Sequence, residues 1–211
     1  MRRLPVYLLV DTSGSMRGEP IQSVNVGLES LVTALRRDPY ALETVYISVI
    51  SFDRDARVVV PLTALDELQL PTIATPESGP THLGKALQLL CERVDKEIIR
   101  TTAEQKGDWL PFLFVMTDGS PSDTALFNSQ VKEIRSRMFA QIIGCAAGHR
   151  AQRKFLEEFC TMVVSLDTMD SVSFASFFKW VSRAVSVGNR SLGSVVEIPL
   201  PPSPAEVQVV V

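Results

Sequence analysis

The stretch LLVDTSGSMRGEP, residues 8–20, joins an apolar run to a loop that holds one aspartate, one threonine and two serines. The apolar run predicts a buried strand, and Glu19-Pro20 predicts the start of a helix because proline suits the first helical turn. Eight residues lie between Val10 and Glu19, whereas connections of this kind usually have about two to six. The additional small, oxygen-bearing side chains therefore require a chemical explanation.

Five apolar runs have the composition of strands that are covered on both faces. They are rich in Val, Ile and Phe and show little alternation, which is typical of a parallel sheet between helices. The runs are LPVYLLV (4–10), VYISVISF (45–52), FLFVM (112–116), FAQIIGC (139–145) and MVVSL (162–166). A further run, RVVVPL (57–62), follows the second strand with no room for a helix, so we expect a short antiparallel edge strand there.

Between these runs, apolar residues recur at helical spacing and predict helices with one buried side. The stripes lie at residues 21–35, 83–94, 127–134, 155–159 and 174–185. Alternation of strands and helices predicts an α/β fold, with a mainly parallel six-stranded sheet covered by helices on both faces.

The chain has 211 residues, a length typical of a single domain. We assign residues 1–187 to this domain and residues 188–211 to a proline-rich C-terminal tail, because the latter show no helical period and contain four prolines. The tail is expected to be either loosely docked or a polyproline or β-addition segment. In the second case it would engage a partner or the domain's own surface.

Composition argues against several classes of function. The net charge of −3 gives no attraction to phosphate backbones, so nucleic acid is not an expected partner. No apolar run reaches the roughly 18 residues of a membrane span, and Asp11 interrupts the only run that resembles a signal peptide. The three cysteines are scattered without a C-x-x-C pair, which predicts buried thiols and a reducing, cytoplasmic location.

Polar side chains follow the strands at the edge where ligands bind in open parallel sheets. Asp11 closes the first strand, Asp118 closes FLFVMTDGS, and Thr81 in SGPTHLG precedes a helix. Neither aspartate is expected to belong to the core. With two serines of the first loop they form an all-oxygen set that suits Mg²⁺ or Mn²⁺ and leaves a coordination position open. The candidate ligands are Asp11, Ser13, Ser15, Thr81 and Asp118.

Two of these residues also have an ordinary structural interpretation. Thr81 could cap the helix that follows it, and Asp118-Gly119 could form a simple turn. Ser13 and Ser15 are not needed as caps, because the first helix is expected to begin at Glu19. Around the rim of the site, four residues are expected to face a partner: Met16, Arg17, His82 and Pro121.

Three segments together resemble a known family. DTSGSM matches the D-x-S-x-S signature of von Willebrand factor A domains, FVMTDGSPSD resembles their aspartate loop, and SGPTHLG resembles their threonine loop. These are the pieces of the metal-ion-dependent adhesion site, and the resemblance extends over about residues 4–187. Within the family, DTSGSMRGEPI and the short length look most like the TerY-type subgroup of small bacterial proteins associated with tellurite resistance.

The resemblance implies a Rossmann-like fold with sheet order 3-2-1-4-5-6 and a module for protein–protein interaction. It also implies that Ser13, Ser15 and Thr81 hold the ion directly or nearly so, and that the two aspartates often act through water. A glutamate or aspartate of a partner protein would fill the open position. Subgroup similarity implies a tellurite- or stress-resistance or phosphorylation-signalling complex, with a PP2C-type phosphatase and a serine/threonine kinase as candidate partners.

The main enzymatic alternative is a Mg²⁺-dependent phosphohydrolase with an aspartate nucleophile. Such enzymes also place an aspartate after the first strand of a parallel sheet beside Mg²⁺. Their common pattern has a second acid two residues later, where this chain has Ser13. We therefore expect a binding module and not an enzyme.

Overall fold

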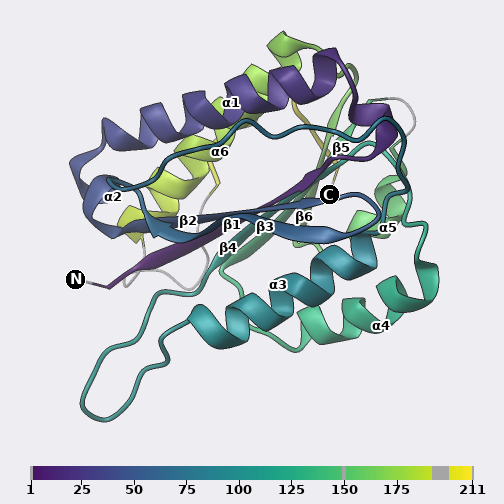
Figure 1. Ribbon diagram of the computed structural model, residues 1–211. Helices are drawn as coiled ribbons and strands as arrows, with labels where there is room; N and C mark the ends of the chain where they lie inside the picture. The colour runs from purple at the N-terminus through teal and green to yellow at the C-terminus, as the bar shows by residue number, and fades with distance from the viewer. Residues whose placement is uncertain (1, 149–150, 192–199, 211) are drawn as a thin grey trace.

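The structure is a computed structural model that describes residues 2–148, 151–191 and 200–210, without the side chains of residues 189–191. These residues form one sheet with strand order β3-β2-β1-β4-β5-β6-β7, lying between two layers of helices (Figure 1). The strands are β1 (Leu4–Asp11), β2 (Val45–Phe52), β3 (Ala56–Ala64), β4 (Phe112–Thr117), β5 (Gln141–Ala147), β6 (Met162–Leu166) and β7 (Gln208–Val210).

The pairing of the strands confirms the predicted α/β sheet. Strand β1 pairs in parallel with both β2 and β4, and β4, β5 and β6 continue the parallel pairing. Strand β3 is the predicted antiparallel edge strand beside β2. The seventh strand, β7, exceeds the six that were predicted for the sheet; it runs antiparallel to β6 at the other edge. Its pairing agrees with the β-addition alternative for the tail.

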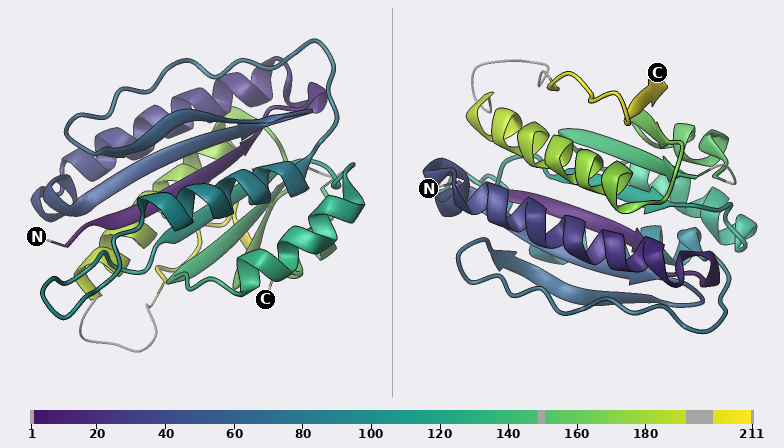
Figure 2. Two further views of the ribbon diagram at one scale, coloured as in Figure 1. Left: turned by 60° about the horizontal axis from the view of Figure 1, so that its bottom comes forward. Right: turned by 90° about the horizontal axis from the view of Figure 1, so that it is seen from above.

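The described residues form six α-helices and one short 3₁₀ turn, η1. Their bounds are η1 (Gly14–Met16), α1 (Glu19–Arg36), α2 (Pro39–Thr44), α3 (Leu83–Glu97), α4 (Thr124–Arg135), α5 (Arg153–Glu157) and α6 (Ser171–Ser191). Helices α1 and α6 lie side by side on one face, and α3 and α4 lie side by side on the other (Figure 2). Nowhere in these described segments is a helix both long and apolar enough to cross a bilayer.

Strand β1 shows why the apolar runs lack alternation. Leu8 and Val10 belong to the core under α1 and α6, whereas Tyr7 and Leu9 belong to the core under α3 and α4. All eight residues of the strand are buried. Both faces of the sheet therefore require apolar side chains, as expected for a central parallel strand.

The described part of the tail lies on the domain's own surface. The indole N–H of Trp180 in α6 donates to the carbonyl of Pro201 at 2.9 Å. Val207 is buried, and the Gln208 side-chain amide donates to the Asp167 carboxylate at 2.9 Å. These contacts lead the chain to β7 on the β6 edge. Helix α6 extends to Ser191, and a domain boundary at residue 187 stays a prediction.

The cysteines are free thiols, and their surroundings agree with a structural role. Cys91 and Cys145 are buried, and Cys160 is partly buried. Burial raises the pKa of the Cys91 thiol to about 11 and that of the Cys145 thiol further. Such groups carry little thiolate at neutral pH and are poor nucleophiles.

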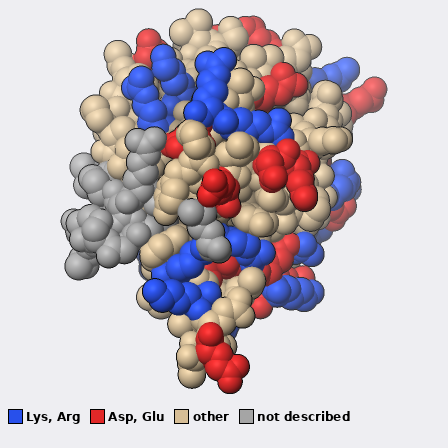
Figure 3. All heavy atoms as spheres, turned by 90° about the vertical axis from the view of Figure 1, so that its left-hand side faces the viewer, with Lys and Arg blue, Asp and Glu red and all other residues tan. Residues whose placement is uncertain are grey.

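The two N-terminal arginines anchor the loop between α3 and β4. The Arg3 guanidinium donates to both carboxylate oxygens of Asp108, at 2.8 and 2.6 Å, and to the carbonyl of Glu97. Arg2 donates to the carbonyls of Gly107 and Asp108 and lies over the Trp109 ring, 3.5 Å from its centroid. The loop projects at the amino ends of the strands, where positive and negative side chains are interspersed (Figures 1 and 3).

Candidate metal site

Asp11 stands at the end of β1 and is held from two sides. Its Oδ1 accepts a hydrogen bond from the backbone N–H of Ser13 at 2.8 Å, and its Oδ2 accepts one from the Thr117 hydroxyl at 2.6 Å. The residue is 0 % exposed, although it belongs to neither of the two apolar core clusters. Burial raises the pKa of Asp11 to about 6, against the opposing effect of these hydrogen bonds. A nearby cation would favour the charged form.

The two serines converge because η1 turns the chain between them. Their hydroxyl oxygens lie 3.2 Å apart, with Ser13 buried and Ser15 exposed. Gly14, between them, donates its N–H to the Gly79 carbonyl at 3.2 Å. A Cβ at Gly14 would lie 3.1 Å from the Ser78 Cα, so the close approach of the two backbones favours glycine.

Thr81 and the loop after β4 are also in contact. A Cβ added to Gly119 would lie 3.1 Å from the Thr81 hydroxyl oxygen, and the Ser122 N–H donates to the Thr81 carbonyl at 2.8 Å. Asp118, directly before Gly119, is 4 % exposed. It follows Thr117, whose hydroxyl donates to Asp11, so the two aspartates stand at the ends of neighbouring strands. The negative charge of Asp118 contributes to the raised pKa of Asp11.

The structure thus brings the three predicted loops together at the carboxyl edge of β1 and β4. They contribute two carboxylates and three hydroxyls: Asp11, Ser13, Ser15, Thr81 and Asp118. In the described segments, no three His, Cys, Asp or Glu side chains form a metal-binding group, so an ion here would depend on hydroxyls and water as well. Such a donor set fits a hard cation such as Mg²⁺ or Mn²⁺. The roles of the five residues as ligands stay predictions.

The sequence interpretation missed Asp53, which follows β2 at the same edge. Its Oδ2 accepts a hydrogen bond from the Thr12 hydroxyl at 3.1 Å, and its carbonyl accepts one from the His82 N–H at 2.9 Å. It therefore connects the loop after β1 to the loop that holds Thr81. The signal was present, because Asp53 directly follows the apolar run VYISVISF, just as Asp11 directly follows LPVYLLV; Asp118 comes one residue after FLFVM.

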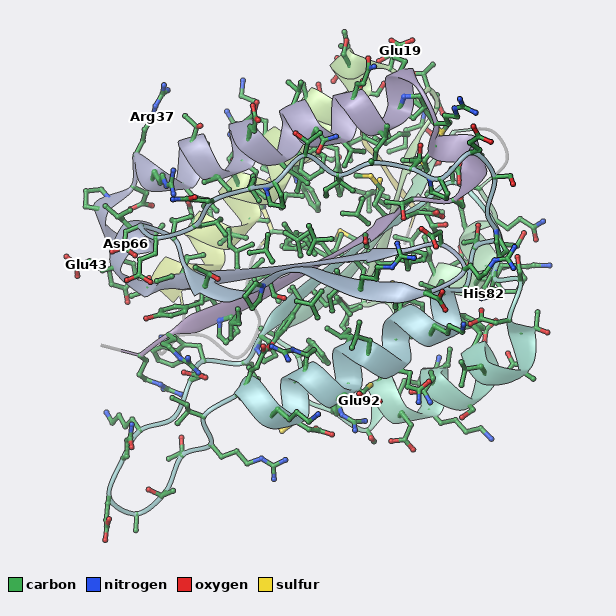
Figure 4. The ribbon with its side chains drawn as sticks, viewed as in Figure 1. Glu19, Arg37, Glu43, Asp66, His82 and Glu92 are labelled. Atoms are coloured by element: carbon green, nitrogen blue, oxygen red, sulfur yellow. The ribbon has the colours of Figure 1, made fainter. Side chains whose placement is uncertain are left out.

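Two of the four residues expected at the rim are in the interior. Met16 is 0 % exposed because η1 turns its side chain into the core under α1 and α6, and Pro121 is buried as well. Arg17 is exposed. His82 is partly exposed, with its Nδ1 2.7 Å from the Arg54 carbonyl. In Figure 4, His82 lies toward the same end of the molecule as Glu19, where α1 begins.

Thr81 is not the N-cap of α3. The helix begins at Leu83, and His82 occupies the N-cap position. The His82 side chain makes no capping hydrogen bond. Instead, the Asp123 carboxylate accepts hydrogen bonds from the backbone N–H groups of Gly84 and Lys85, at 3.1 and 2.9 Å. Asp123 belongs to the start of α4, so the cap comes from another segment.

We expect Asp123→Ala to destabilise the chain by about 1 kcal/mol, because it leaves two N–H groups of α3 without an acceptor. Urea denaturation measures the effect. Asp66→Ala is the matched control, since within the described residues that exposed carboxylate accepts a bond only from the neighbouring Glu67 N–H. Equal stability of the two variants would contradict a capping role for Asp123.

Comparison with known proteins places this geometry in context. The family model of the von Willebrand factor type A domain matches residues 6–176. A search among curated protein sequences found no match.

Solved structures share the fold at low sequence identity. Proximal thread matrix protein 1 of the mussel byssus is 17% identical, with a TM-score of 0.67 over 86% of this chain and 48% of its own. A second structure of that protein has a zinc-occupied metal-ion-dependent adhesion site (MIDAS) motif. A von Willebrand factor type A protein from Catenulispora acidiphila is 15% identical, with a TM-score of 0.65 over 88% of this chain and 43% of its own. The present chain thus spans about half the length of these proteins.

Proposed function

The chain belongs to the von Willebrand factor type A domain family, and from this premise we propose that it is a metal-dependent protein interaction module. Domains of this family bind protein partners, often through a divalent ion, and a zinc-occupied MIDAS motif occurs in a structural neighbour. In our proposal, the ion is Mg²⁺ or Mn²⁺ and the partner supplies a glutamate or aspartate. The chain itself would catalyse no reaction.

One observation carries this proposal: two buried carboxylates, Asp11 and Asp118, stand at the ends of the paired strands β1 and β4. The Ser13 and Ser15 hydroxyls lie together on the loop after β1, and the Thr81 hydroxyl lies beside Gly119 in the loop after β4. The hydroxyls of Ser13, Ser15 and Thr81 would hold the ion together with these aspartates. When bound, the ion would supply an electrophilic centre for an oxygen of the partner. Two carboxylates at best neutralise a divalent ion, so an incoming carboxylate would gain a charge-assisted interaction in a partly dry site.

The surroundings of Asp11 favour binding over phosphohydrolase chemistry. A nucleophilic aspartate needs an accessible oxygen, whereas Asp11 is 0 % exposed and both of its oxygens accept hydrogen bonds. The position of the usual second acid is occupied by Ser13, which is buried beside Ser15. We therefore do not propose the phosphohydrolase.

A finer assignment rests on the resemblance of DTSGSMRGEPI to the TerY-type subgroup. On that basis we propose a cytoplasmic bacterial protein that acts in a tellurite- or stress-resistance complex. A PP2C-type phosphatase and a serine/threonine kinase would then be the first partners to test.

Affinity capture from a lysate of the source organism tests the proposed function. Tagged wild-type and Asp118→Ala chains are compared with Mg²⁺ and with chelator, and retained proteins are identified by mass spectrometry. A partner retained only by the wild type with Mg²⁺ is the expected result. A partner retained equally in all four conditions would place the interaction away from the metal site.

A further inference from the structure

A hollow adjoins the candidate metal site at the carboxyl ends of β4, β5 and β6. Its volume is about 470 Å³, within the range of pockets that hold ligands. Ser15 and Asp118 of the metal site form part of its wall. The other lining residues are Ala147, Gly148, Asp167, Thr168 and Met169. Any segment bound at the metal site would therefore extend over or beside this hollow.

The wall away from the metal site is mainly apolar. Ala147 is buried at the end of β5, and the side chain of Met169 packs on the core while remaining partly exposed. Gly148 has a positive φ of 77°, and a Cβ there would lie 3.0 Å from the Met169 Cγ. Glycine at this position therefore brings the backbone close to the methionine, whose flexible thioether adapts to different apolar ligands.

The polar side chains of this wall are already engaged within the chain. The Asp167 carboxylate accepts a hydrogen bond from the Gln208 amide of β7 at 2.9 Å. The Thr168 hydroxyl donates to the Asp170 carboxylate at 2.8 Å and lies 2.7 Å from the Ser173 hydroxyl. No lysine, arginine or histidine is among the lining residues that the structure describes. The hollow thus suits an apolar group better than an anionic or strongly polar one.

We propose that this hollow receives an apolar side chain of the same partner segment whose carboxylate binds the metal ion. The inference rests on the proposed function and specifies the partner's chemistry. Successive Cα atoms are about 3.8 Å apart, and alternate side chains of an extended peptide point the same way. The recognised element is therefore an acidic residue with a leucine, methionine or phenylalanine one or two positions away.

Synthetic peptides test the proposal with a defined ligand. Each carries one glutamate in a glycine–serine background, with leucine at one of the two positions on either side, or with no apolar residue. Binding is followed by NMR of the chain labelled with ¹³C at its methionine methyl groups, in Mg²⁺ and in chelator. Burial of a leucine side chain predicts a roughly ten- to hundredfold gain in Mg²⁺-dependent affinity for at least one position. The Met169 methyl signal should shift with that peptide.

Met169→Gln provides the matched test, because the side chain keeps its length and loses its apolar end. We expect it to remove most of the leucine-dependent gain and to leave the affinity for the glutamate-only peptide unchanged. Met138→Gln is the control, since Met138 is 73% exposed and is not among the lining residues. It should keep the leucine-dependent gain.

The outcomes separate the two proposals. Equal Mg²⁺-dependent affinity for peptides with and without leucine would overturn this inference and leave the proposed function intact. Binding of leucine peptides that is unaffected by chelator would overturn the link between hollow and ion. A Met169 signal that shifts with protein concentration alone would assign the hollow to a second copy of the chain and also overturn the inference. If no peptide binds in Mg²⁺, this inference fails, and the capture experiment with Asp118→Ala decides the proposed function separately.

Discussion

Asp118→Ala is expected to abolish the stabilisation that Mg²⁺ confers on the folded chain, without unfolding the metal-free protein. An ion at a hundred times its Kd stabilises a protein by about 2.7 kcal/mol, which raises Tm by about 5–10 °C for a chain of this size. The variant removes one of the two carboxylates of the site.

Thermal unfolding with increasing Mg²⁺ measures this effect, and isothermal titration gives the Kd. Asp55→Ala is the control: this exposed aspartate lies in the loop after β2 and pairs with Lys85 at 2.8 Å. The control should retain the full response to Mg²⁺. A response that persists in Asp118→Ala would place the ion elsewhere, and a metal-free variant that is unfolded would make Asp118 a structural residue.

Arg3→Ala should lower the free energy of unfolding by about 3 kcal/mol, because it leaves the Asp108 carboxylate buried without its cation. The Asp108 side chain is only 3% exposed, and its pairing with Arg3 closes the loop between α3 and β4 onto the start of β1. The hydrogen bond to Asp108 raises the pKa of Arg3. We expect Tm to fall by about 6–12 °C.

Urea denaturation of a double-mutant cycle tests the cause. Asp108→Asn combined with Arg3→Ala should be more stable than Arg3→Ala alone, because the unpaired buried charge is gone. Arg100→Ala, an exposed residue of the same loop, should change stability little. If the double variant is less stable than Arg3→Ala alone, lost packing rather than the buried charge accounts for the effect.

Local pattern was enough to predict the α/β fold, the edge position of β3 and the start of α1 at Glu19. The apolar runs and the helical stripes mark the faces of each element that must be buried. Each such pattern is encoded within the few residues of its own element. The candidate ligands were predicted in the same way. Aspartates that directly follow buried strands must lie at the carboxyl edge of a parallel sheet, and the same rule would have found Asp53.

Tertiary structure alone decided the features that depend on contacts between distant segments. Asp123 caps a helix about 40 residues before it, and Arg3 pairs with Asp108, which is 105 residues further along the chain. The docking of β7 on β6 and the burial of Met16 beneath α1 are of the same kind. None of these has a local signature, because a carboxylate, an arginine or a short apolar run has many possible partners. Only the packing of the whole sheet and its helices selects one.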